Sequence, residues 1–532
     1  MYHLSKARFN AVWQMKNFFK SVKIESMSKP KLFKKVLVVN RGEIARRIFL
    51  ACRELNIPST AIYSEADEAA PWVRLADESY PLAGVTATET YLNQEAIFRV
   101  AHTCGIDAIH PGYGFLSENP AFAQACAEHD ITFIGPSPAA MRALGSKAAA
   151  RVLAEKADVP VVPGVDGAGL SLTELQAAAD EIGYPVLIKA SAGGGGKGMR
   201  VVNEPAEFAD AVHAARNEAG SAFGDDHILV EKYFTEIHHV EIQILADQHG
   251  RTLHLYEREC SIQRRHQKIV EESPAPVITD PDLRQAIATA AVRLAETAAY
   301  VNAGTVEFIV DEQGGFYFLE MNTRLQVEHP VTELVTGLDL ATWQIRIAAG
   351  EALPFEQRDI RQRGHALECR VYAEDPANGF LPSIGEITTY RPPAGPGVRV
   401  DDGIETGTAV SPYYDPMLAK IITWGRDRAE AIRKMQRALH DTVILGVQTN
   451  IPYLLAILAE PHFQAGQTST NYLTQYMDTW PLVGTREDED WLAAVIFEFL
   501  QGGGKRVGGT AVTDESQAQY DPWNETVPWR NV

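Results

Sequence analysis

Two acidic side chains and one amide stand in two apolar segments that a short turn connects. Glu307 lies in VEFIV, and Glu320 and Asn322 lie in FYFLEMN, thirteen and fifteen residues later. If DEQGG forms a hairpin turn, both carboxylates face one point, where hard oxygen ligands and phosphate oxygens suit Mg²⁺ or Mn²⁺. The alternative is an ordinary hairpin whose glutamates point into solvent. FLEM argues against it, because apolar neighbours surround Glu320 and a charge among them needs a partner.

A cation, an amide and a carboxylate then follow at every second position. They are Arg324, Gln326 and Glu328, in NTRLQVEH. If this stretch is extended, the three side chains share one face. Together they could hold a small oxyanion and remove its proton. A structural Arg–Glu pair is the alternative.

A basic segment, QRRHQK, adds Gln263, His266 and Lys268. Taken alone, such a segment indicates a basic surface loop. The acids nearby favour a second interpretation, in which these side chains supply cations and hydrogen bonds to a phosphate site.

A glycine-rich stretch, SAGGGGKGMR at 191–200, lies between two apolar runs. Gly193, Gly195 and Gly198 satisfy G-x-G-x-x-G, but a dinucleotide site needs a helix directly after the last glycine. A P-loop needs Ser or Thr after Gly-Lys, and here Gly198 follows. PVLIKA before the stretch and MRVV after it predict strand, loop and strand. The stretch is therefore either a hairpin whose backbone N–H groups approach an anion or merely a tight hairpin.

The elements that must position these residues begin at position 34. KKVLVVNRGEIARRIFLACRELN (34–56) predicts a buried strand, a turn and a helix, and STAIYSE (59–65) predicts the next strand. AIHPGYGFLSENPAFAQAC (108–126) repeats strand, glycine turn and helix, and ITFIGPS (131–137) closes the series. Strands that alternate with helices indicate a doubly wound parallel sheet with ligand loops at the carboxyl ends of its strands.

Two further blocks follow. The first runs from Lys147 to about residue 360 and contains a helix in SLTELQAAADEIG, the glycine hairpin, strands in HILVEKYF and HHVEIQILADQHG, and a helix over 339–350. The second, 364–475, opens with HALECRVYAED and closes on helices rich in Leu and Ile. From about residue 483 the composition becomes acidic and then glycine-rich, which is typical of a linker.

Composition limits the function classes. The 532 residues, 45% of them hydrophobic, predict about three or four domains. No apolar run approaches the roughly 18 residues of a membrane span, so we expect no membrane association. A net charge of −20 argues against nucleic-acid binding. Five widely separated cysteines favour a reduced, cytoplasmic chain.

The first 35 residues differ from the rest, because they hold nine Lys or Arg and one acid, Glu25. A targeting segment for an organelle is one interpretation, although Arg8 is its single arginine and no apolar stretch follows. Translation from Met27 is the other. Neither interpretation makes this segment part of the fold.

The assembled motifs closely resemble those of the biotin carboxylases, the ATP-grasp enzymes that carboxylate biotin in biotin-dependent carboxylases. The resemblance covers about residues 34–475. It rests on VVNRGEIARRI, HPGYGFLSEN, FIGP followed by GSK, IKASAGGGGKGMR, HHVEIQ, RECSIQRRHQK, EESPAP, LEMNTRLQVEHPVTE, HALECRVYAEDP and YYDPMLAK. Ala192 and Lys197 are small variations in the glycine stretch, and we expect no loss of function from them.

The resemblance implies an α/β fold (α+β overall) in five parts. A basic extension (1–33) precedes a Rossmann-like doubly wound domain (34–146). An ATP-grasp domain (147–360) with a mobile glycine-rich lid at about 160–235 comes next. A C-terminal mixed α/β domain (361–478) and a tail (479–532) without a biotin carrier domain complete the chain.

The resemblance also implies the site. Glu307 and Glu320, with Asn322, hold two Mg²⁺ ions, which Mn²⁺ can replace. Lys147 and Lys189 bind the nucleotide phosphates, Glu231, Lys232 and the backbone near Phe234 bind adenine, and His239 lies on the ribose side. The implied ATP contacts are completed by the backbone amides of Gly195 and Gly196 and by Gln263 and His266.

The implied reaction starts from bicarbonate. Glu328 takes its proton while Lys268, Arg324, Gln326 and the Val327 backbone hold the anion. Attack on the γ-phosphate gives carboxyphosphate, which breaks down to CO₂ and phosphate. The phosphate deprotonates biotin, and Arg370 stabilises the enolate that captures CO₂.

The implied partners are separate proteins. A carrier lysine sits between methionines in this family, whereas Met-Lys occurs here only at Met15-Lys16. We therefore expect biotin to arrive on a biotin carboxyl carrier protein, a carboxyltransferase subunit to use the product, and the chain to form a homodimer. The final acceptor (acetyl-CoA, another acyl-CoA, pyruvate or urea) is not specified.

Two rival functions use many of the same residue types. One is an ATP-grasp ligase that joins a carboxylate to an amine, and RLQVEHPVTE and Arg370 in HALECRVYAED argue against it. The other is a nucleotide-binding regulatory protein without turnover, and the filled acid, base and metal positions argue against that.

Overall fold

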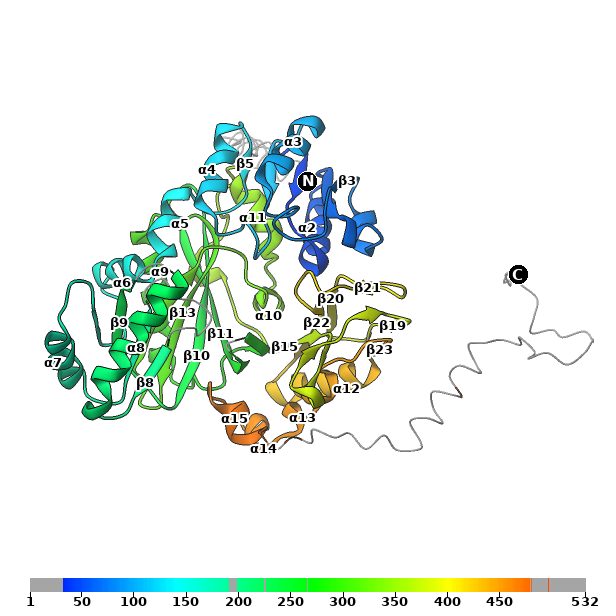
Figure 1. Ribbon diagram of the computed structural model, residues 1–532. Coiled ribbons are helices and arrows are strands. Elements are labelled where there is room, and N and C mark those ends of the chain that lie inside the picture. The colour runs from blue at the N-terminus through cyan, green and yellow to red at the C-terminus, as the bar shows by residue number, and fades with distance from the viewer. Residues whose placement is uncertain are drawn as a thin grey trace, which may run out of the picture. The chain divides into compact units, whose positions relative to one another are not determined.

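The computed structural model describes residues 32–190, 199–223, 226–265 and 267–478, together with Trp480 and Ile496. The chain divides into two compact units, Met1–Trp480 and Pro481–Val532. All elements described below belong to the first unit and are labelled in Figure 1. None of the helices in this described part combines the length and apolar composition that a bilayer crossing requires.

The predicted parallel sheet is confirmed. Five strands pair in the order β3-β2-β1-β4-β5, all parallel. Burial of every residue of β1 agrees with a parallel sheet that is covered on both faces. The elements are β1 (Val36–Val38), α2 (Gly42–Glu54), β2 (Ser59–Ser64), β3 (Glu78–Leu82), α3 (Gln94–Cys104), β4 (Ala108–His110), α4 (Pro120–Glu128) and β5 (Thr132–Phe133), with 3₁₀ turns at Glu65–Asp67 and Pro71–Leu75.

Strand β3 was absent from the prediction. Its sequence, ESYPL, is mostly polar and contains Pro81, so it shows neither an apolar run nor a clean alternation. Its position at the edge of the sheet explains both properties, because an edge strand tolerates proline and exposed polar residues.

A second, smaller sheet contains the strands on either side of the glycine stretch. Its four strands pair antiparallel in the order β6-β9-β7-β8. Lys189 pairs with Met199, so the two predicted strands on either side of the stretch are confirmed, while residues 191–198, with Gly195 and Gly196, lie outside the described residues. The elements are β6 (Gly164–Asp166), α7 (Leu172–Ile182), β7 (Val186–Ala190), β8 (Met199–Val202), α8 (Pro205–Phe223) and β9 (Ile228–Lys232), after α5 (Pro138–Gly145) and α6 (Lys147–Lys156).

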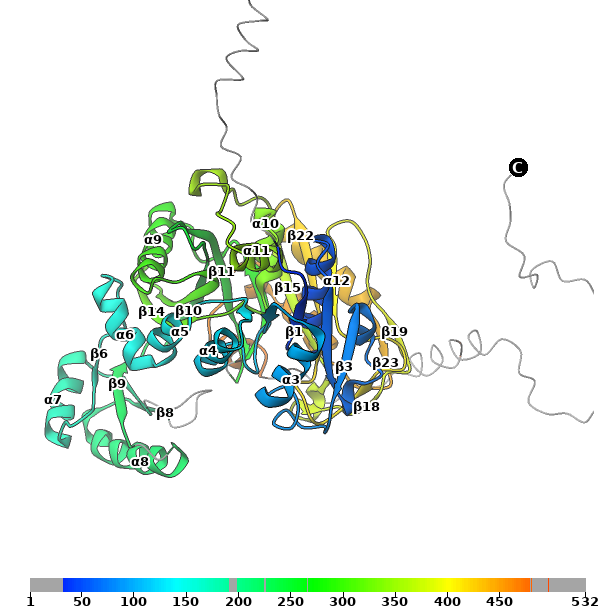
Figure 2. The ribbon, with the colours of Figure 1, turned by 90° about the horizontal axis from the view of Figure 1, so that it is seen from above.

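This small sheet has an apolar core of its own, formed by side chains of α7, α8 and the strands such as Leu175, Ile188 and Phe208. It stands at one side of the first unit in both Figure 1 and Figure 2. The predicted helix in SLTELQAAADEIG is α7, and the Ser171 side chain caps its start.

The largest sheet has eight strands, in the order β14-β13-β10-β11-β12-β15-β22-β20, and every pairing is antiparallel. Strands from both sides of position 360 share it, because β12 pairs with β15. The strands are β10 (Ile237–Ala246), β11 (Thr252–Arg264), β12 (Gln267–Ser273), β13 (Asn302–Asp311), β14 (Phe316–Asn322), β15 (His365–Tyr372), β20 (Val398–Asp402) and β22 (Met417–Gly425).

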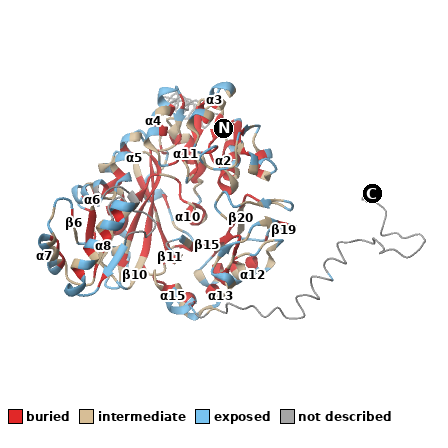
Figure 3. Ribbon diagram, in the orientation of Figure 1, coloured by how far each residue is buried: buried red, intermediate tan, exposed pale blue. Residues whose placement is uncertain are grey.

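Helices cover this sheet, and Figure 3 shows buried strands with helices that carry exposed residues on one side. One apolar cluster joins α9 to β10 and β13, and another joins α12 and α13 to β15. The helices are α9 (Pro281–Thr297), α10 (His329–Thr336), α11 (Leu340–Ala348), α12 (Arg428–Asp441), α13 (Ile451–Ala459), α14 (Pro461–Gln464) and α15 (Tyr472–Tyr476).

Three small ladders complete the C-terminal part. They pair β16 (Glu374–Asp375) with β17 (Leu381–Pro382), β18 (Gly385–Glu386) with β21 (Ala409–Val410), and β19 (Thr389–Arg391) with β23 (Val443–Leu445).

Candidate active site

The β13–β14 hairpin brings the predicted metal ligands together. Glu307 and Glu320 are directly opposite each other in its register. Asn322 donates from Nδ2 to Glu307 Oε1 at 2.8 Å. The hairpin interpretation of DEQGG is therefore confirmed, and the outward-facing alternative is wrong for Glu307, which is 4% exposed.

The two glutamates of the hairpin have opposite electrostatics. Burial works to raise the pKa of Glu307, but the charges of Lys268 and His239 outweigh burial and hold that pKa well below its usual value. Burial and the charge of Glu307 raise the pKa of Glu320. Two carboxylates this close, Glu307 buried and Glu320 half-buried, repel each other, and a divalent cation between them removes that repulsion.

The donor set fits a hard cation at the hairpin. Glu307 and Glu320 offer carboxylate oxygens and Asn322 an amide oxygen, which are the ligand types of Mg²⁺. Glu241, Cys260 and Glu328 form another group whose ligand atoms lie within 4.8 Å of one another. Its thiol is a soft ligand, and the Lys268 ammonium already contacts both carboxylates.

Lys268 is the cation at the centre of the site. Its Nζ lies 2.6 Å from Glu241 Oε2, 2.9 Å from Glu307 Oε1 and 2.7 Å from Glu328 Oε1. Burial disfavours the charged lysine, but the three carboxylates outweigh it and raise the pKa of Lys268 well above its usual value. The surface-loop alternative for QRRHQK is therefore wrong for Lys268.

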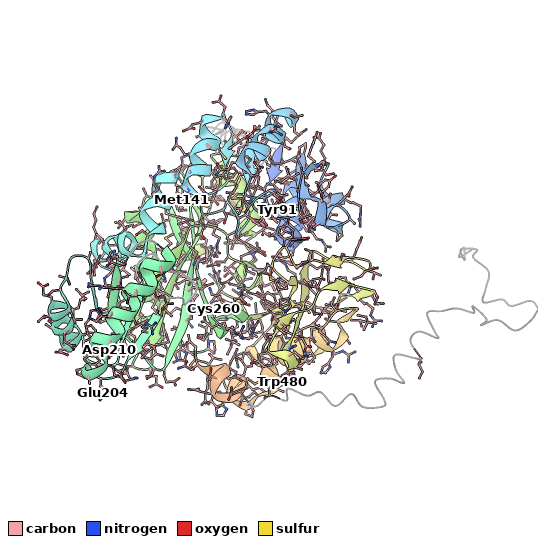
Figure 4. All side chains as sticks on the ribbon, in the orientation of Figure 1. Tyr91, Met141, Glu204, Asp210, Cys260 and Trp480 are labelled. Atoms are coloured by element: carbon pink, nitrogen blue, oxygen red, sulfur yellow. The ribbon has the colours of Figure 1, made fainter. Side chains whose placement is uncertain are left out.

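Glu328 lies between two cations. Besides Lys268, the Arg370 guanidinium donates from Nη2 to Glu328 Oε2 at 3.0 Å, and from Nε to Glu271 Oε1 at 2.5 Å. Burial works to raise the pKa of Glu328, but Lys268, Arg370 and Arg258 lower it well below its usual value. The buried carboxylate is thus ionised, as a general base requires. Cys260, labelled in Figure 4, lies beside it, with Sγ 3.9 Å from Glu328 Oε1.

Arg324 and Gln326, which precede Glu328 in the chain, contact the hairpin. Arg324 donates to Gln326 Oε1 at 2.5 Å and to Asn322 Oδ1 at 2.9 Å. Gln326 in turn donates to Glu307 Oε1 at 3.1 Å. The side chain of Arg324 also lies 3.3 Å from Glu118, in the loop after β4.

The predicted extended face is only partly correct. Val327 and Glu328 form a turn directly before α10, which begins at His329 and has proline at its start. Pro330 favours this helix start, so the alternation stops at Gln326. Glu328 and Gln326 still belong to one hydrogen-bond network. Lys268 contacts both Glu328 and Glu307, and Gln326 donates to Glu307.

A pocket for a second ligand lies next to the hairpin. Among its lining residues are Lys147 at the start of α6, Lys189 of β7 and Glu231 of β9, with Phe318 and Leu319, which directly precede Glu320. Lys189 Nζ lies 2.5 Å from Glu231 Oε2. Two lysines beside a carboxylate hairpin make a pocket suited to a phosphate-bearing ligand with its metal.

Other predicted nucleotide residues divide into three groups. His239 Nε2 lies 2.9 Å from Glu307 Oε2, and Gln263 donates to His239 Nδ1 at 3.4 Å, so both belong to the site. The Lys232 ammonium instead donates to the carbonyls of Gly183 and Tyr184, and the ring of Phe234 stacks on Tyr317. His266 lies outside the described residues.

Several site residues escaped the sequence analysis. Arg258 is fully buried and contacts Glu241, Gln243 and Thr305. Lys420 donates to the Val327 carbonyl at 2.7 Å. For Glu241 and Gln243 the sequence holds one indication of a site role. They are polar residues that alternate with apolar ones in HHVEIQIL, and the strand buries them.

Comparisons with known proteins agree with this geometry. Residues 32–141 match the family model "Biotin carboxylase, N-terminal domain", residues 146–356 match "Carbamoyl-phosphate synthase L chain, ATP binding domain", and residues 368–475 match "Biotin carboxylase C-terminal domain".

Individual relatives match over most of the chain. Biotin carboxylase of Nostoc sp. is 50% identical over 443 residues, which are 83% of this chain and 99% of that protein. Biotin carboxylase 1 of Bacillus subtilis is 50% identical over 446 residues, covering 84% and 99%. A dimer of the biotin carboxylase domain of Hydrogenobacter thermophilus 2-oxoglutarate carboxylase, solved with MgADP, ADP and bicarbonate, superposes with a TM-score of 0.79 at 48% identity, covering 84% and 98%.

Proposed function

Because this chain belongs to the biotin carboxylase family, we propose that it carboxylates biotin with bicarbonate while it cleaves ATP to ADP and phosphate. The observation that carries the proposal is the Glu328 carboxylate, held between Lys268 and Arg370 and linked through Lys268 to Glu307 of the Glu307–Glu320 hairpin. A base, an anion-binding set and a place for a metal–phosphate ligand are thus side by side.

Glu328 accepts the proton of bicarbonate. Lys268, Arg324, Gln326 and the Val327 backbone hold the resulting anion, whose oxygen attacks the γ-phosphorus as the bond to the ADP oxygen breaks. Carboxyphosphate then separates into CO₂ and phosphate. Glu307, Glu320 and Asn322 would hold the Mg²⁺, which neutralises charge on the phosphate oxygens when bound.

Arg370 serves the second half of the reaction. The released phosphate takes the proton from the ureido nitrogen of biotin, and the nitrogen then forms its bond to CO₂. Negative charge develops on the ureido oxygen, and a preorganised guanidinium stabilises it. Support comes from the place of Arg370, which is 8% exposed and fixed by Glu271.

The nucleotide roles follow from the pocket beside the hairpin. We assign Lys147 and Lys189 to the nucleotide phosphates and Glu231 to the adenine side. Lys232 and Phe234 are assigned to adenine as well, through their backbone atoms. The segment 160–235 is proposed as the lid over this pocket, supported by the separate apolar core of its sheet. The roles of Gly195, Gly196 and His266 stay predictions.

The partners are part of the proposal. We infer that biotin is presented by a separate biotin carboxyl carrier protein, that a carboxyltransferase subunit uses the product, and that the chain forms a homodimer. The solved relative from Hydrogenobacter thermophilus is a dimer, which supports the last point. A cytoplasmic location is proposed from the cysteines, all of which are free.

The decisive experiment measures ADP release with each substrate omitted in turn. We expect release only when bicarbonate and free biotin are both present, together with transfer of ¹⁴C from labelled bicarbonate to biotin. Release that needs an amine acceptor instead of biotin would identify a carboxylate–amine ligase. Nucleotide binding without release under any condition would identify a regulatory protein.

A further inference from the structure

We propose that Lys420 is a positioning residue for the bicarbonate pocket, holding the backbone that carries Glu328. The inference rests on the proposed function and deepens it, since it concerns the same base. Lys420 lies on β22, in the C-terminal part of the large sheet, whereas Glu328 precedes α10. No exposed surface remains on Lys420.

The ammonium of Lys420 lies near one backbone carbonyl and two carboxylates. Nζ donates to the Val327 carbonyl at 2.7 Å and lies 3.2 Å from Glu43 Oε1 and 3.9 Å from Asp401 Oδ2. Its shortest contact is thus to the backbone rather than to a carboxylate. Glu43 and Asp401 keep the buried lysine charged, which strengthens the hydrogen bond to the carbonyl.

That carbonyl belongs to the peptide between Val327 and Glu328. The preceding residue is fixed separately, because Gln326 donates to Glu307 and its own carbonyl contacts His329 Nδ1 at 2.7 Å. Lys420 therefore secures the next peptide along the turn. Because this hydrogen bond fixes the orientation of the Val327–Glu328 peptide plane, it also limits the direction in which the Glu328 side chain leaves the backbone.

Arg370 and Lys420 act as a pair. They are direct cross-strand neighbours on β15 and β22, so their side chains leave the same face of the sheet. Arg370 holds the carboxylate of Glu328, and Lys420 holds the carbonyl of the residue before it. Adjacent positions of one sheet thus fix both the side chain and the backbone of the base.

Glu43 connects this pair to the parallel sheet. It lies in the first turn of α2, is 5% exposed, and accepts a hydrogen bond from the Tyr113 hydroxyl. Lys420 consequently joins α2, the turn before α10 and β22 at one buried point. A change at Lys420 would act on Glu328 by moving the turn, because the ammonium holds the Val327 carbonyl rather than the Glu328 carboxylate.

The test is Lys420→Met in the full chain, since methionine keeps the unbranched shape without the charge. We expect kcat/KM for bicarbonate to fall by about 10- to 100-fold, the range that a misplaced reacting group gives. The KM for bicarbonate should rise while the KM for ATP stays within about twofold, because the nucleotide pocket lies on β7, β9 and α6. A variant that is only less stable would lose active enzyme with both KM values unchanged, and that result would overturn the proposal.

The matched control is Lys434→Met. Lys434 also donates to a carbonyl and a carboxylate, Trp424 O at 2.8 Å and Glu430 at 3.1 Å, but it lies on α12 away from the site. Its KM values should match those of the wild type. A bicarbonate effect of equal size in both variants would also overturn the proposal.

A milder variant covers the case in which Lys420→Met does not fold. Glu43→Gln removes the carboxylate nearest to Lys420 and lets the ammonium shift toward Asp401. We expect a smaller rise in the KM for bicarbonate, about threefold or more, again without an ATP effect, and an unchanged value would overturn the inference. If the wild type itself shows no turnover that needs bicarbonate and biotin, the proposed function fails first and the inference falls with it.

Discussion

At the scale of single residues, the site is a set of buried charges that neutralise one another. Lys268 forms ion pairs with three carboxylates, Arg370 with two, and Arg258 with Glu241. Removing one charge leaves its partner buried and unpaired, which costs more than the lost hydrogen bond.

The hairpin pair gives the first prediction. Glu320→Gln removes one of the two carboxylate charges that we propose bind Mg²⁺, so ATP turnover should fall roughly 100-fold or more. ADP binding, measured by calorimetry, should largely survive. Glu312→Gln is the control, because Glu312 is exposed in the turn of the same hairpin. Near-normal turnover of Glu320→Gln would contradict the metal assignment.

Arg370 gives the second prediction. Arg370→Ala should lower the rate of biotin carboxylation by roughly 10²–10³-fold, the loss typical of a preorganised donor, with the KM for ATP unchanged. An ATP KM that rises in step, with kcat intact, would indicate a nucleotide or structural role. Arg426→Ala, at an exposed arginine paired with Glu430, serves as the control.

The same variant changes the pH profile in a defined direction. Arg370 lowers the pKa of Glu328, whose ionised form is the proposed base. Without Arg370 that pKa rises, so the acid limb of the kcat/KM profile for bicarbonate should move to higher pH. An acid limb at the wild-type position would show that another group controls it.

At the scale of elements, one buried ion cluster connects the strands to a helix. Glu272 of β12 accepts from Arg428 of α12 at 2.7 and 2.9 Å and lies 2.6 Å from His365 of β15. Burial opposes ionisation, but Arg428 and His365 outweigh it and lower the pKa of Glu272 to about 2. A carboxyl whose pKa is lowered by folding stabilises the protein above its unfolded pKa and loses that contribution as pH falls through the folded value.

Glu272→Gln should therefore destabilise the protein at neutral pH by about 3–5 kcal/mol, the range for a broken buried pair. The difference from the wild type should shrink between about pH 4.5 and pH 2, where the wild-type carboxyl takes up its proton. Thermal midpoints of both proteins across this range measure it. Glu95→Gln, in the exposed pair with Arg99, should leave the midpoint unchanged, and a constant Glu272→Gln difference down to pH 2 would contradict the linkage.

How far the sequence predicted each element depended on distance along the chain. The β13–β14 hairpin was predictable because its turn and both glutamates lie in one short segment. The contacts of Lys420 with Glu43 and of Arg258 with Thr332 were not, since their partners lie far apart in the sequence. Strand β3 was hidden by its polar, proline-containing edge sequence.

At the scale of the whole molecule, the end of the chain forms a separate unit, Pro481–Val532. It contains none of the residues assigned to the site. Deleting residues 484–532 should leave carboxylation of free biotin nearly unchanged. If WLAAVIFEFL (491–500) docks on a partner, the deletion should weaken carboxylation of carrier-bound biotin. Loss of folded protein or of free-biotin turnover on deletion would make the tail part of the fold instead.

The pairing of β12 with β15 limits where the gene can be cut and rejoined. A fragment ending at position 360 would expose β12 as a long unpaired edge, which favours aggregation. Chimeras between relatives should exchange 237–425 as one piece, because the segment carries Lys268, Glu328, Arg370 and Lys420 on strands and turns of one sheet. Such an exchange keeps both strands of the β12–β15 ladder from one parent, whereas a crossover at position 360 pairs a strand of one parent with a strand of the other.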